Sequence, residues 1–489
     1  MPDWIASLPT LLGASLVALE IAVVVAALGI VPGNRRPSTG MAWLILVLAV
    51  PLFGLIAFLF LGRADVGRKR RETQARANRI IRERTAEVTE LDMAAHGLEY
   101  VTSVALLNRN LGSLPAVKGN SVELFPDYLE SIAAMTRAVD GAEHFVHVQF
   151  YITGWDEVTE PFFAALVRAT ERGVRVRLLL DHLGSRGIPS YKETVRKLEA
   201  TSIEWRRLLP VDPLRGEWRR PDLRNHRKIL VVDDTVAFAG SQNLIEPGYD
   251  KPKNHELGRK WVELTTSVRG PAVRSLDKVF LTDWFTETGE LPDEGIHTEP
   301  HGGGEGGTVV QVVPSGPGFV AENNLRMFTT LIYSAQHRVS VTSPYFVPDE
   351  SLLYAMTTAA QRGVAIELFV GEEADQFMVH HAQRSYYQAL LEAGVRIHLY
   401  PSPLVLHAKH FTIDDSVAVI GSSNMDLRSF ALNAEVTLML LGDEVVRDMR
   451  AVEDTYRSLS HELTREEWEG RSRRSRYVDN VMRLTSALQ

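Results

Sequence analysis

Two sets of side chains in this sequence have the types and spacing for chemistry at a phosphodiester. Each set has a histidine, a lysine two positions later and an aspartate five positions after the lysine: His226, Lys228 and Asp233, then His407, Lys409 and Asp414. A Gly-Ser-x-Asn segment follows each set and contributes Ser241 and Asn243, then Ser422 and Asn424. Because every member of the second copy lies 181 positions after its counterpart, the pattern predicts one composite site made of two half-sites.

The chemistry that these residues support is displacement at phosphorus. A lysine ammonium can hold the non-bridging oxygens while a neutral imidazole attacks the phosphorus atom. In-line displacement also needs an acid for the leaving group on the opposite side, so we expect the second histidine to come from the other half-site. Two lysines and two asparagine amides would then stabilise the charge on the equatorial oxygens, a task that a metal performs elsewhere.

Carboxylates are expected to support this site in two ways. Each histidine needs a partner that fixes its tautomer, and Glu263 and Glu435 lie at comparable places on the strand expected after each hairpin. Asp233 and Asp414 begin turns, so we assign them to holding the hairpin and its lysine in place. A direct role for these two aspartates in proton transfer is disfavoured.

Strand–turn–strand elements must position both half-sites. Residues 228–232 and 411–413 are strand-like, and short strands at 236–239 and 417–420 follow the aspartate turns. Because strand side chains alternate, the histidine and lysine of one set should lie on one face. The hairpin should bring each asparagine back toward the histidine of its own set.

A longer repeat surrounds these hairpins and predicts an α/β fold. A strand, a helix and a second strand are expected at residues 144–152, 159–171 and 174–180, and again at 338–342, 349–361 and 364–370. We therefore expect a first repeat at 116–300 and a second at 308–489, the latter ending in a basic helix. The glycine-rich residues 301–307 between them read as a flexible linker.

Composition narrows the range of functions. The chain has 489 residues, enough for two or three domains, and its formal charge of −8 argues against a protein that coats nucleic acid. It contains no cysteine, which excludes thiolate nucleophiles and cysteine-based zinc sites. No phosphate-binding loop of the Walker A type is present, so ATP is not an expected substrate.

Histidine pairs raise the question of a metal site. His407 with His410, and His380 with His381, are candidates, but lysine lies beside potential ligands of the first pair. His461 and Glu462 begin a zinc-protease pattern in which Arg465 replaces the second histidine. We therefore expect neither a metal nor another cofactor.

The N-terminal residues 1–62 are expected to form a transmembrane helical hairpin. Two apolar runs, 11–31 and 41–61, each contain 21 residues, about the length that crosses a bilayer core. A cleaved signal peptide is the alternative, disfavoured because Asp3 stands where such a peptide has basic residues and because a second run follows closely. Glu20 within the first run is expected to pack against the neighbouring helix or a second subunit, which leaves a homo-oligomer open.

Basic residues suggest how the rest of the chain meets a membrane. They crowd the segment just after the second apolar run, which predicts a cytoplasmic catalytic part at the cell membrane, and residues 63–115 read as an amphipathic connector. A basic loop before the first motif is predicted to hold anionic lipid headgroups, and the alternative is a solvated loop. Its arginines are Arg206, Arg207, Arg215, Arg219, Arg220 and Arg224. The C-terminal arginines are weaker candidates for the same binding of anionic headgroups: Arg471, Arg473, Arg474 and Arg476.

The duplicated motifs resemble those of the phospholipase D superfamily. Further segments are similar to the bacterial cardiolipin synthases of that superfamily, and the similarity covers nearly the whole chain. They are the N-terminal hairpin with Arg35-Arg36-Pro37 and Ala42-Trp43-Leu44, residues 312–317 (Val-Val-Pro-Ser-Gly-Pro) and residues 343–349 (Ser-Pro-Tyr-Phe-Val-Pro-Asp).

This resemblance implies two tandem phospholipase D-like α/β/α sandwich repeats in a pseudo-twofold arrangement. It also implies that two phosphatidylglycerol molecules become cardiolipin and glycerol through a phosphatidyl-histidine intermediate. Near symmetry leaves the two histidine roles open; we assign His226 as nucleophile and His407 as the acid and base. Membrane phospholipids are then the partners, and nucleic acid is not.

Other functions remain to be distinguished. Water could resolve the same intermediate, which would make the protein a phospholipase D-type hydrolase of membrane phospholipids. A nuclease-like phosphodiesterase is disfavoured by the apolar N-terminus and the acidic balance. A catalytically silent membrane scaffold is disfavoured because both half-sites are complete.

Overall fold

The computed structural model describes residues 18, 21–31, 37–62, 68–84, 99–112, 114–212, 220–292, 306–319, 322–373 and 376–484. The chain divides into two compact units, Met1–Asp65 and Val66–Gln489. The second unit, the predicted catalytic unit, contains both His-Lys-Asp sets.

The N-terminal unit contains a short helical hairpin whose boundaries differ from the prediction. The expected single helix at 41–61 is two helices, α2 (Pro37–Ala49) and α3 (Pro51–Leu61). Val50 separates them with φ −141° and ψ 77°, because a proline at the next position disfavours helical backbone before it. The two helices fold back on each other: the Trp43 and Phe58 rings lie 5.6 Å apart, edge to face.

Less of the first predicted span falls within the described residues. Residues 21–30 are helical, whereas residues 11–17 and Glu20 lie outside what the structure describes. Among the residues described, no helix combines the length and the apolar composition needed to cross a bilayer.

The first half of the catalytic unit is built on a seven-stranded mixed sheet. Its strand order is β2 (Ser121–Phe125), β10 (Thr265–Arg269), β8 (Val236–Gly240), β7 (Ile229–Val232), β3 (Phe145–Phe150), β4 (Arg175–Asp181) and β5 (Glu204–Leu208). Strands β3, β4 and β5 run parallel, and the others pair antiparallel. Its helices are α6 (Tyr128–Asp140), α7 (Glu160–Glu171), α8 (His182–Arg186), α9 (Tyr191–Glu199), α10 (Pro252–Glu256) and α11 (Ala272–Thr288).

The second half repeats this plan on a ten-stranded sheet. Its main order is β1 (Ala116–Gly119), β11 (Gly306–Ser315), β20 (Asn433–Leu441), β18 (Val417–Gly421), β17 (His410–Ile413), β12 (Arg338–Thr342), β14 (Ala365–Gly371), β15 (Arg396–Tyr400) and β21 (His461–Glu462), and β6 (Arg224–Asn225) joins at β20. Its longer helices are α12 (Asn323–Ser334), α13 (Glu350–Gln361), α14 (Phe377–Arg384), α17 (Asp443–Leu459) and α19 (Arg473–Arg483). Shorter ones are α15 (Tyr387–Ala393), α16 (Leu427–Ala431) and α18 (Arg465–Glu469).

The strand–helix–strand repeat predicted from the sequence is confirmed. The observed elements β3, α7 and β4, and then β12, α13 and β14, begin and end within two residues of the expected bounds. Gly173 and Gly363 follow α7 and α13 with φ of +88° and +95°, a conformation that glycine adopts without strain.

Two predicted boundaries differ from the structure. Residues 306–307 belong to β11 rather than to a linker, and Gly306 lies so close to Asn120 that a Cβ atom would come within 2.1 Å of the Asn120 carbonyl oxygen. Strand β1, at the start of the predicted first repeat, pairs with β11 in the second sheet. The predicted connector at 63–115 contains α4 (Arg68–Arg84) and α5 (Glu99–Gly112).

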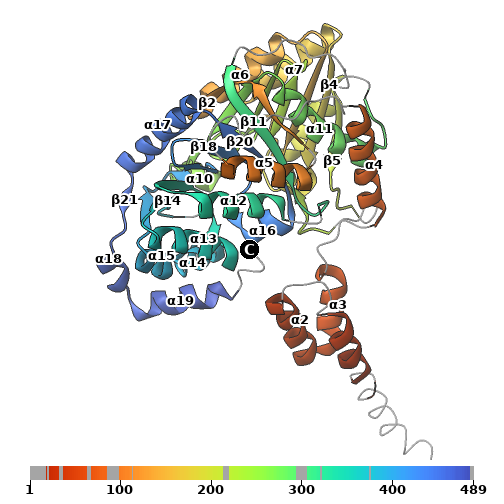
Figure 1. The fold of residues 1–489 in the computed structure, drawn as a ribbon. Helices are drawn as coiled ribbons and strands as arrows, with labels where there is room; N and C mark the ends of the chain where they lie inside the picture. The colour runs from red at the N-terminus through yellow and green to blue at the C-terminus, as the bar shows by residue number, and fades with distance from the viewer. Residues whose placement is uncertain are drawn as a thin grey trace, which may run out of the picture. The chain divides into compact units, whose positions relative to one another are not determined.

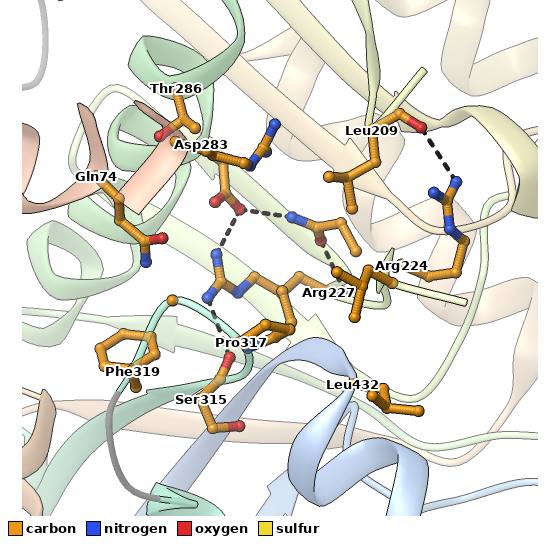
Figure 2. A pocket seen from close by; sticks show the side chains of 15 residues that line it. Gln74, Leu209, Arg224, Arg227, Asp283, Thr286, Ser315, Pro317, Phe319 and Leu432 are labelled. Atoms are coloured by element: carbon orange, nitrogen blue, oxygen red, sulfur yellow. Dashed lines mark hydrogen bonds and ion pairs between the residues drawn. The ribbon is translucent and has the colours of Figure 1, made fainter. Parts of the chain in front are cut away.

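Both of these helices pack on the catalytic unit. Helix α5 lies beside α12 and buries Val101, Val104 and Ala105 in the core of the second half (Figure 1). Helix α4 packs on α11, where Arg70 forms a 2.6 Å ion pair with Glu287. Figure 2 shows Gln74 of α4 at a pocket that also contains Asp283 and Arg227.

One apolar core joins the two halves. From the first half it contains side chains of β7, β8, β10 and α11. From the second half it contains side chains of β18, β20 and α17, and of the residues just before β17. Ile229, Val231, Ile420 and Leu438 in this core are fully buried. The two sheets are therefore held as one body, which fixes the relative position of the two half-sites.

Candidate active site

Short backbone pairings between the halves place each motif against the other half. Strand β6, just before His226, pairs parallel with the start of β20, and β16 (Val405–Leu406), just before His407, pairs parallel with β9 (Trp261–Val262). The His226 amide donates to the Ala434 carbonyl and the His407 amide to the Val262 carbonyl, both at 2.8 Å. Since Glu435 and Glu263 are the next residues, each carboxylate lies beside the histidine of the opposite half.

These pairings correct one expectation. The histidines and lysines were expected within strands, but β7 begins only at Ile229 and β17 at His410. The backbone amides of both histidines bond to the other half instead of to a neighbouring strand of their own sheet.

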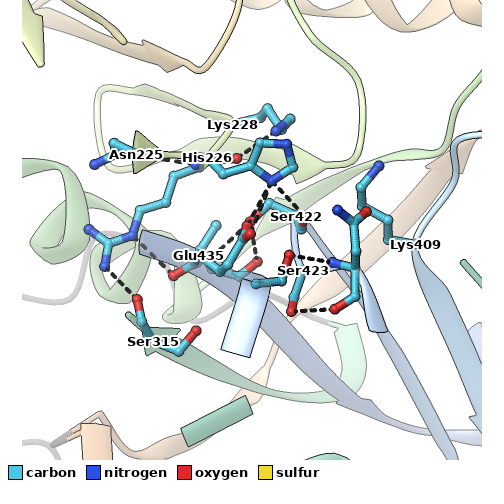
Figure 3. Close-up of polar contacts among 12 residues, drawn as sticks. Asn225, His226, Lys228, Ser315, Lys409, Ser422, Ser423 and Glu435 are labelled. Carbon is cyan, nitrogen blue, oxygen red and sulfur yellow. Dashed lines mark hydrogen bonds and ion pairs between the residues drawn. The ribbon is translucent and has the colours of Figure 1, made fainter. Parts of the chain in front are cut away.

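The first imidazole is held by the second half. His226 Nδ1 lies 3.0 Å from Glu435 Oε2 and 3.0 Å from the Ser422 carbonyl oxygen. The Ser422 hydroxyl donates to Glu435 at 2.5 Å, and Figure 3 shows His226 pointing toward both residues. Glu435 is fully buried. These partners leave Nε2 as the ring nitrogen for chemistry.

The second imidazole is held by the first half in the same way. His407 Nδ1 lies 2.7 Å from Glu263 Oε1, and Glu263 is fully buried. The Tyr249 hydroxyl also donates to Glu263 Oε1, at 3.2 Å, and the nearby Ser241 hydroxyl donates to the Leu264 carbonyl at 3.2 Å. Tyr249 carries a positive φ of 62°, within a turn that has no counterpart in the second half.

Both lysines are buried beside their histidines. Lys228 Nζ donates to the His226 carbonyl at 2.5 Å, and Lys409 Nζ donates to the His407 carbonyl at 2.6 Å. Lys228 also lies over the ring of Tyr151, 5.3 Å from its centroid. Lys409 Nζ also lies 3.1 Å from His407 Nδ1 and 3.2 Å from His407 Nε2.

The two motif aspartates lie at the far end of each hairpin. The Asp233 carboxylate accepts the backbone N–H groups of Glu143, His144 and Phe145 at 2.7 to 2.9 Å. Asp414 accepts those of Gln336, His337 and Arg338 at 2.7 to 3.0 Å. Their φ angles of 51° and 47° fit tight turns, in which aspartate is tolerated. Each aspartate thus ties its hairpin to the start of the neighbouring strand.

The two motif glycines allow the carboxylate-bearing strands to approach. A Cβ atom at Gly240 would come 2.4 Å from the Leu264 carbonyl oxygen, and one at Gly421 would come 2.4 Å from the Val436 carbonyl oxygen. Only glycine leaves room for this approach.

One cavity of about 430 Å³ brings the half-sites together. Both histidines and both asparagines line it, together with other side chains: Tyr151, Tyr249, Lys251, Tyr345, Gln376, Asp426 and Arg428. Asn243 is partly engaged, because its Nδ2 donates to the Tyr249 hydroxyl at 2.8 Å and its Oδ1 accepts from the Ile152 amide at 3.1 Å. The Asn424 Oδ1 atom is buried without a hydrogen-bond partner within the described residues.

Electrostatics distinguish the two half-sites. Burial, with Lys228 and Lys409 nearby, holds the pKa of His226 well below 6.5. Burial raises the pKa of Glu435 to about 7, against the lowering effect of Lys228. Burial also tends to raise the pKa of Glu263, but His407, Lys409 and Ser241 outweigh it and leave that pKa below 4.5. Burial lowers the pKa of Lys228 to about 7.

Several supporting residues lack a local sequence signal. Arg227 donates to Asp283 at 2.5 Å and to the Glu435 carbonyl at 3.0 Å, so it ties the His226 backbone to both halves. Asn225 donates to Asp283 at 2.8 Å. The repeat could have pointed to Arg227, since its counterpart is Ala408, but only the fold shows what it binds.

Two predicted lipid-binding arginines are engaged in the fold. Arg224 is buried with an ion pair to Asp181 at 3.2 Å, and Arg471 pairs with Asp479 at 2.6 Å while packing on Trp468. Both therefore serve packing rather than headgroups. Arg215 and Arg219 lie outside the described residues.

Two of the histidines considered for a metal lie beside single carboxylates. His381 bonds to Asp479 at 2.7 Å, and His410 is buried 3.8 Å from Glu453. In the part of the chain that the structure describes, no group of three or more histidine, aspartate or glutamate side chains is arranged to hold a metal ion.

Comparison with known proteins agrees with this geometry. The family model "Cardiolipin synthase, PLD-like domain" matches residues 135–284 and 328–454, and "Phospholipase_D-nuclease N-terminal" matches residues 21–63. Cardiolipin synthase A of Proteus mirabilis is 33% identical over 466 residues, which is 93% of this chain and 94% of that protein. The same enzyme of Serratia proteamaculans is 34% identical over 465 residues, with the same coverage.

The fold also resembles a solved structure. The crystal structure of phosphatidylserine synthase from Haemophilus influenzae Rd KW20 has a TM-score of 0.56 at 14% identity, and the match covers 80% of this chain and all of that one. With the family match over more than half of the sequence and the relatives over nearly all of it, this chain belongs to the cardiolipin synthase family of phospholipase D-like proteins.

Proposed function

We propose that this protein is a cardiolipin synthase, a phosphatidyltransferase that converts two phosphatidylglycerol molecules into cardiolipin and glycerol. The observation that carries the proposal is the crossed pair of imidazoles, each bound through Nδ1 to a buried glutamate of the other half and both lining one cavity. Such a pair supplies a nucleophile and a proton carrier for one phosphorus atom.

The first step forms the covalent intermediate. Nε2 of His226 attacks phosphorus, the bond from phosphorus to the glycerol headgroup oxygen breaks, and His407 gives its proton to that oxygen. Phosphatidyl-His226 and free glycerol result. In the second step His407 removes the proton from a hydroxyl of another phosphatidylglycerol, whose oxygen attacks phosphorus and releases His226. One phosphodiester replaces another, so no nucleotide is needed.

The surroundings of the two histidines support this assignment of roles. A nucleophilic imidazole must be neutral, and the pKa of His226 lies well below 6.5. An acid must hold a proton, and His407 lies 2.7 Å from the Glu263 carboxylate, whose pKa below 4.5 keeps it negatively charged. The motif alone leaves the roles open, whereas the surroundings favour one order.

The remaining motif residues act on charge. Lys228 and Lys409, buried beside the histidines, are proposed to neutralise the equatorial phosphate oxygens, and Asn424, which lines the cavity, is proposed to add an amide. Asn243 is better placed to orient Tyr249 than to bind phosphate with its full amide. Ser241 and Ser422 support the glutamates, and Asp233 and Asp414 support the hairpins.

A phospholipase D-type hydrolase is the second candidate, because water could enter the cavity in place of the acceptor lipid. A product assay with purified full-length protein, defined phosphatidylglycerol vesicles and no added metal separates the two. Cardiolipin and glycerol in equal amounts are expected. Phosphatidate without cardiolipin would contradict the synthase function.

We also propose that the N-terminal unit anchors the protein to the cell membrane, with the catalytic unit on the cytoplasmic side. The apolar runs near the N-terminus and the arginines after them support this arrangement. Reporter fusions after residue 63 and after the C-terminus should both report the cytoplasm. A periplasmic signal from either fusion would contradict this orientation.

A further inference from the structure

The reaction places two phosphodiesters in the cavity, but the paired motifs handle only one phosphorus atom. Cardiolipin carries a second phosphodiester, joined to the first through one glycerol. Both histidines line the cavity, each has a motif lysine and a glutamate beside it, and the proposed mechanism assigns all six groups to the reacting phosphorus. The second anion must therefore meet cavity residues that have no counterpart in the other half.

The segments after the two motif asparagines differ in this way. Asn243 is followed by Leu244 and Ile245, which are fully buried in the apolar core of the first half. By the 181-residue repeat, Asp426 takes the place of Ile245, and Arg428 takes the place of Pro247. Of these, Asp426 and Arg428 line the catalytic cavity. The second half thus adds a charged wall that the first half lacks.

Arg428 is held in place at this wall. The Asp426 carboxylate accepts the Ser429 amide at 2.7 Å and so begins α16, on which Arg428 lies. The half-buried guanidinium donates to the Asp222 carbonyl at 3.0 Å, which fixes it against the first half. Among the residues described, no carboxylate lies within ion-pair distance of Arg428. Most of its five N–H donors therefore remain for a ligand.

We propose that Arg428 binds the second phosphodiester, the one carried by the acceptor phosphatidylglycerol and retained in cardiolipin. This proposal rests on the cardiolipin synthase function proposed above. A planar guanidinium that is already held on one side suits a phosphodiester, because it offers two parallel N–H groups and loses little freedom on binding. Lys251 is the other cavity cation without a counterpart, but it is exposed and must be ordered by the ligand.

The test compares two reactions in one preparation of the full-length protein. Exchange of labelled glycerol into phosphatidylglycerol needs only one phosphodiester in the site, whereas cardiolipin formation needs two. We expect Arg428→Gln to lower the ratio of cardiolipin formation to glycerol exchange by about tenfold or more, the size expected for a charged hydrogen bond. Arg428→Lys should restore part of the ratio. Arg326→Gln, at an exposed arginine on α12 outside the cavity, is the matched control and should leave the ratio unchanged.

Each outcome decides the proposal. A variant that folds less well lowers both rates equally, so the ratio reports binding of the acceptor. An unchanged ratio in Arg428→Gln, or a ratio that falls in Lys251→Gln instead, overturns the assignment of Arg428. If the unsubstituted protein exchanges glycerol or releases phosphatidate but makes no cardiolipin, the proposed function fails rather than this subsite.

Discussion

The two half-sites have nearly the same motif but different surroundings. Around His226, a glutamate with a pKa of about 7 and the anchored Arg227 accompany an imidazole whose pKa is well below 6.5. Around His407, the glutamate has a pKa below 4.5 and bonds to Tyr249, while Ala408 occupies the place of Arg227. A duplicated motif therefore supplies two imidazoles, and residues outside the motif give them different surroundings, most clearly in the opposite pKa shifts of the two glutamates.

Removing either imidazole gives the largest expected effect and tests whether the roles differ. His226→Ala and His407→Ala should each lower cardiolipin formation by about 1000-fold or more, since the first removes the nucleophile and the second removes the acid and base. Rapid quenching with labelled phosphatidylglycerol should trap a phosphatidyl-enzyme in the His407→Ala variant and none in His226→Ala. Trapping in the opposite variant would reverse the roles.

The glutamates sharpen the comparison at the next level. Glu435→Gln and Glu263→Gln should each lower kcat by about 10- to 100-fold, because each removes the acceptor that orients an imidazole of the other half. Glu263→Gln should also slow the exchange of labelled glycerol into phosphatidylglycerol. The substitution removes a negative charge beside His407, so the imidazole holds its proton less strongly. Equal pH–rate profiles for both variants would remove the basis for the asymmetry.

The lysine of the first half-site makes a pH prediction. Lys228 must be protonated to bind phosphate, and burial lowers its pKa to about 7, so kcat/KM should fall as pH rises through about 7. At low pH, His226 must lose its proton before it can attack. Because its pKa is well below 6.5, the acidic limb of the pH–rate profile should lie below pH 6.5. Lys228→Arg should move the alkaline limb to higher pH, because arginine stays charged. An unmoved limb would assign it to another group.

The aspartates of the two hairpins should affect stability more than chemistry. Asp233→Ala and Asp414→Ala each leave three backbone N–H groups without their acceptor, and we expect each to cost about 2 kcal/mol of folding free energy. Thermal unfolding measures this loss, and kcat of the folded fraction should change little. A large loss of kcat at unchanged stability would give these aspartates a role in catalysis.

Much of the architecture was predictable because it depends on local patterns. The alternation of strand-like and helical runs located β3, α7 and β4 and their second copies within two residues. Boundaries that depend on distant partners were less accurate: β1 joins the second sheet through β11, and Pro51 divides the expected long helix. The prediction that Arg224 holds a lipid headgroup failed for the same reason. Its ion-pair partner Asp181 is 43 positions away in the sequence and comes near it only in the folded chain.

The sequence by itself determined the reacting groups: two histidines and two lysines in register, with glutamates at comparable places after them. Only the tertiary structure decided that each glutamate serves the histidine of the opposite half. The physical reason is the pairing of β6 with β20 and of β16 with β9, which joins segments about 150 to 200 residues apart by backbone hydrogen bonds. Backbone hydrogen bonds are the same for every side chain, so no residue pattern marks which segments will pair.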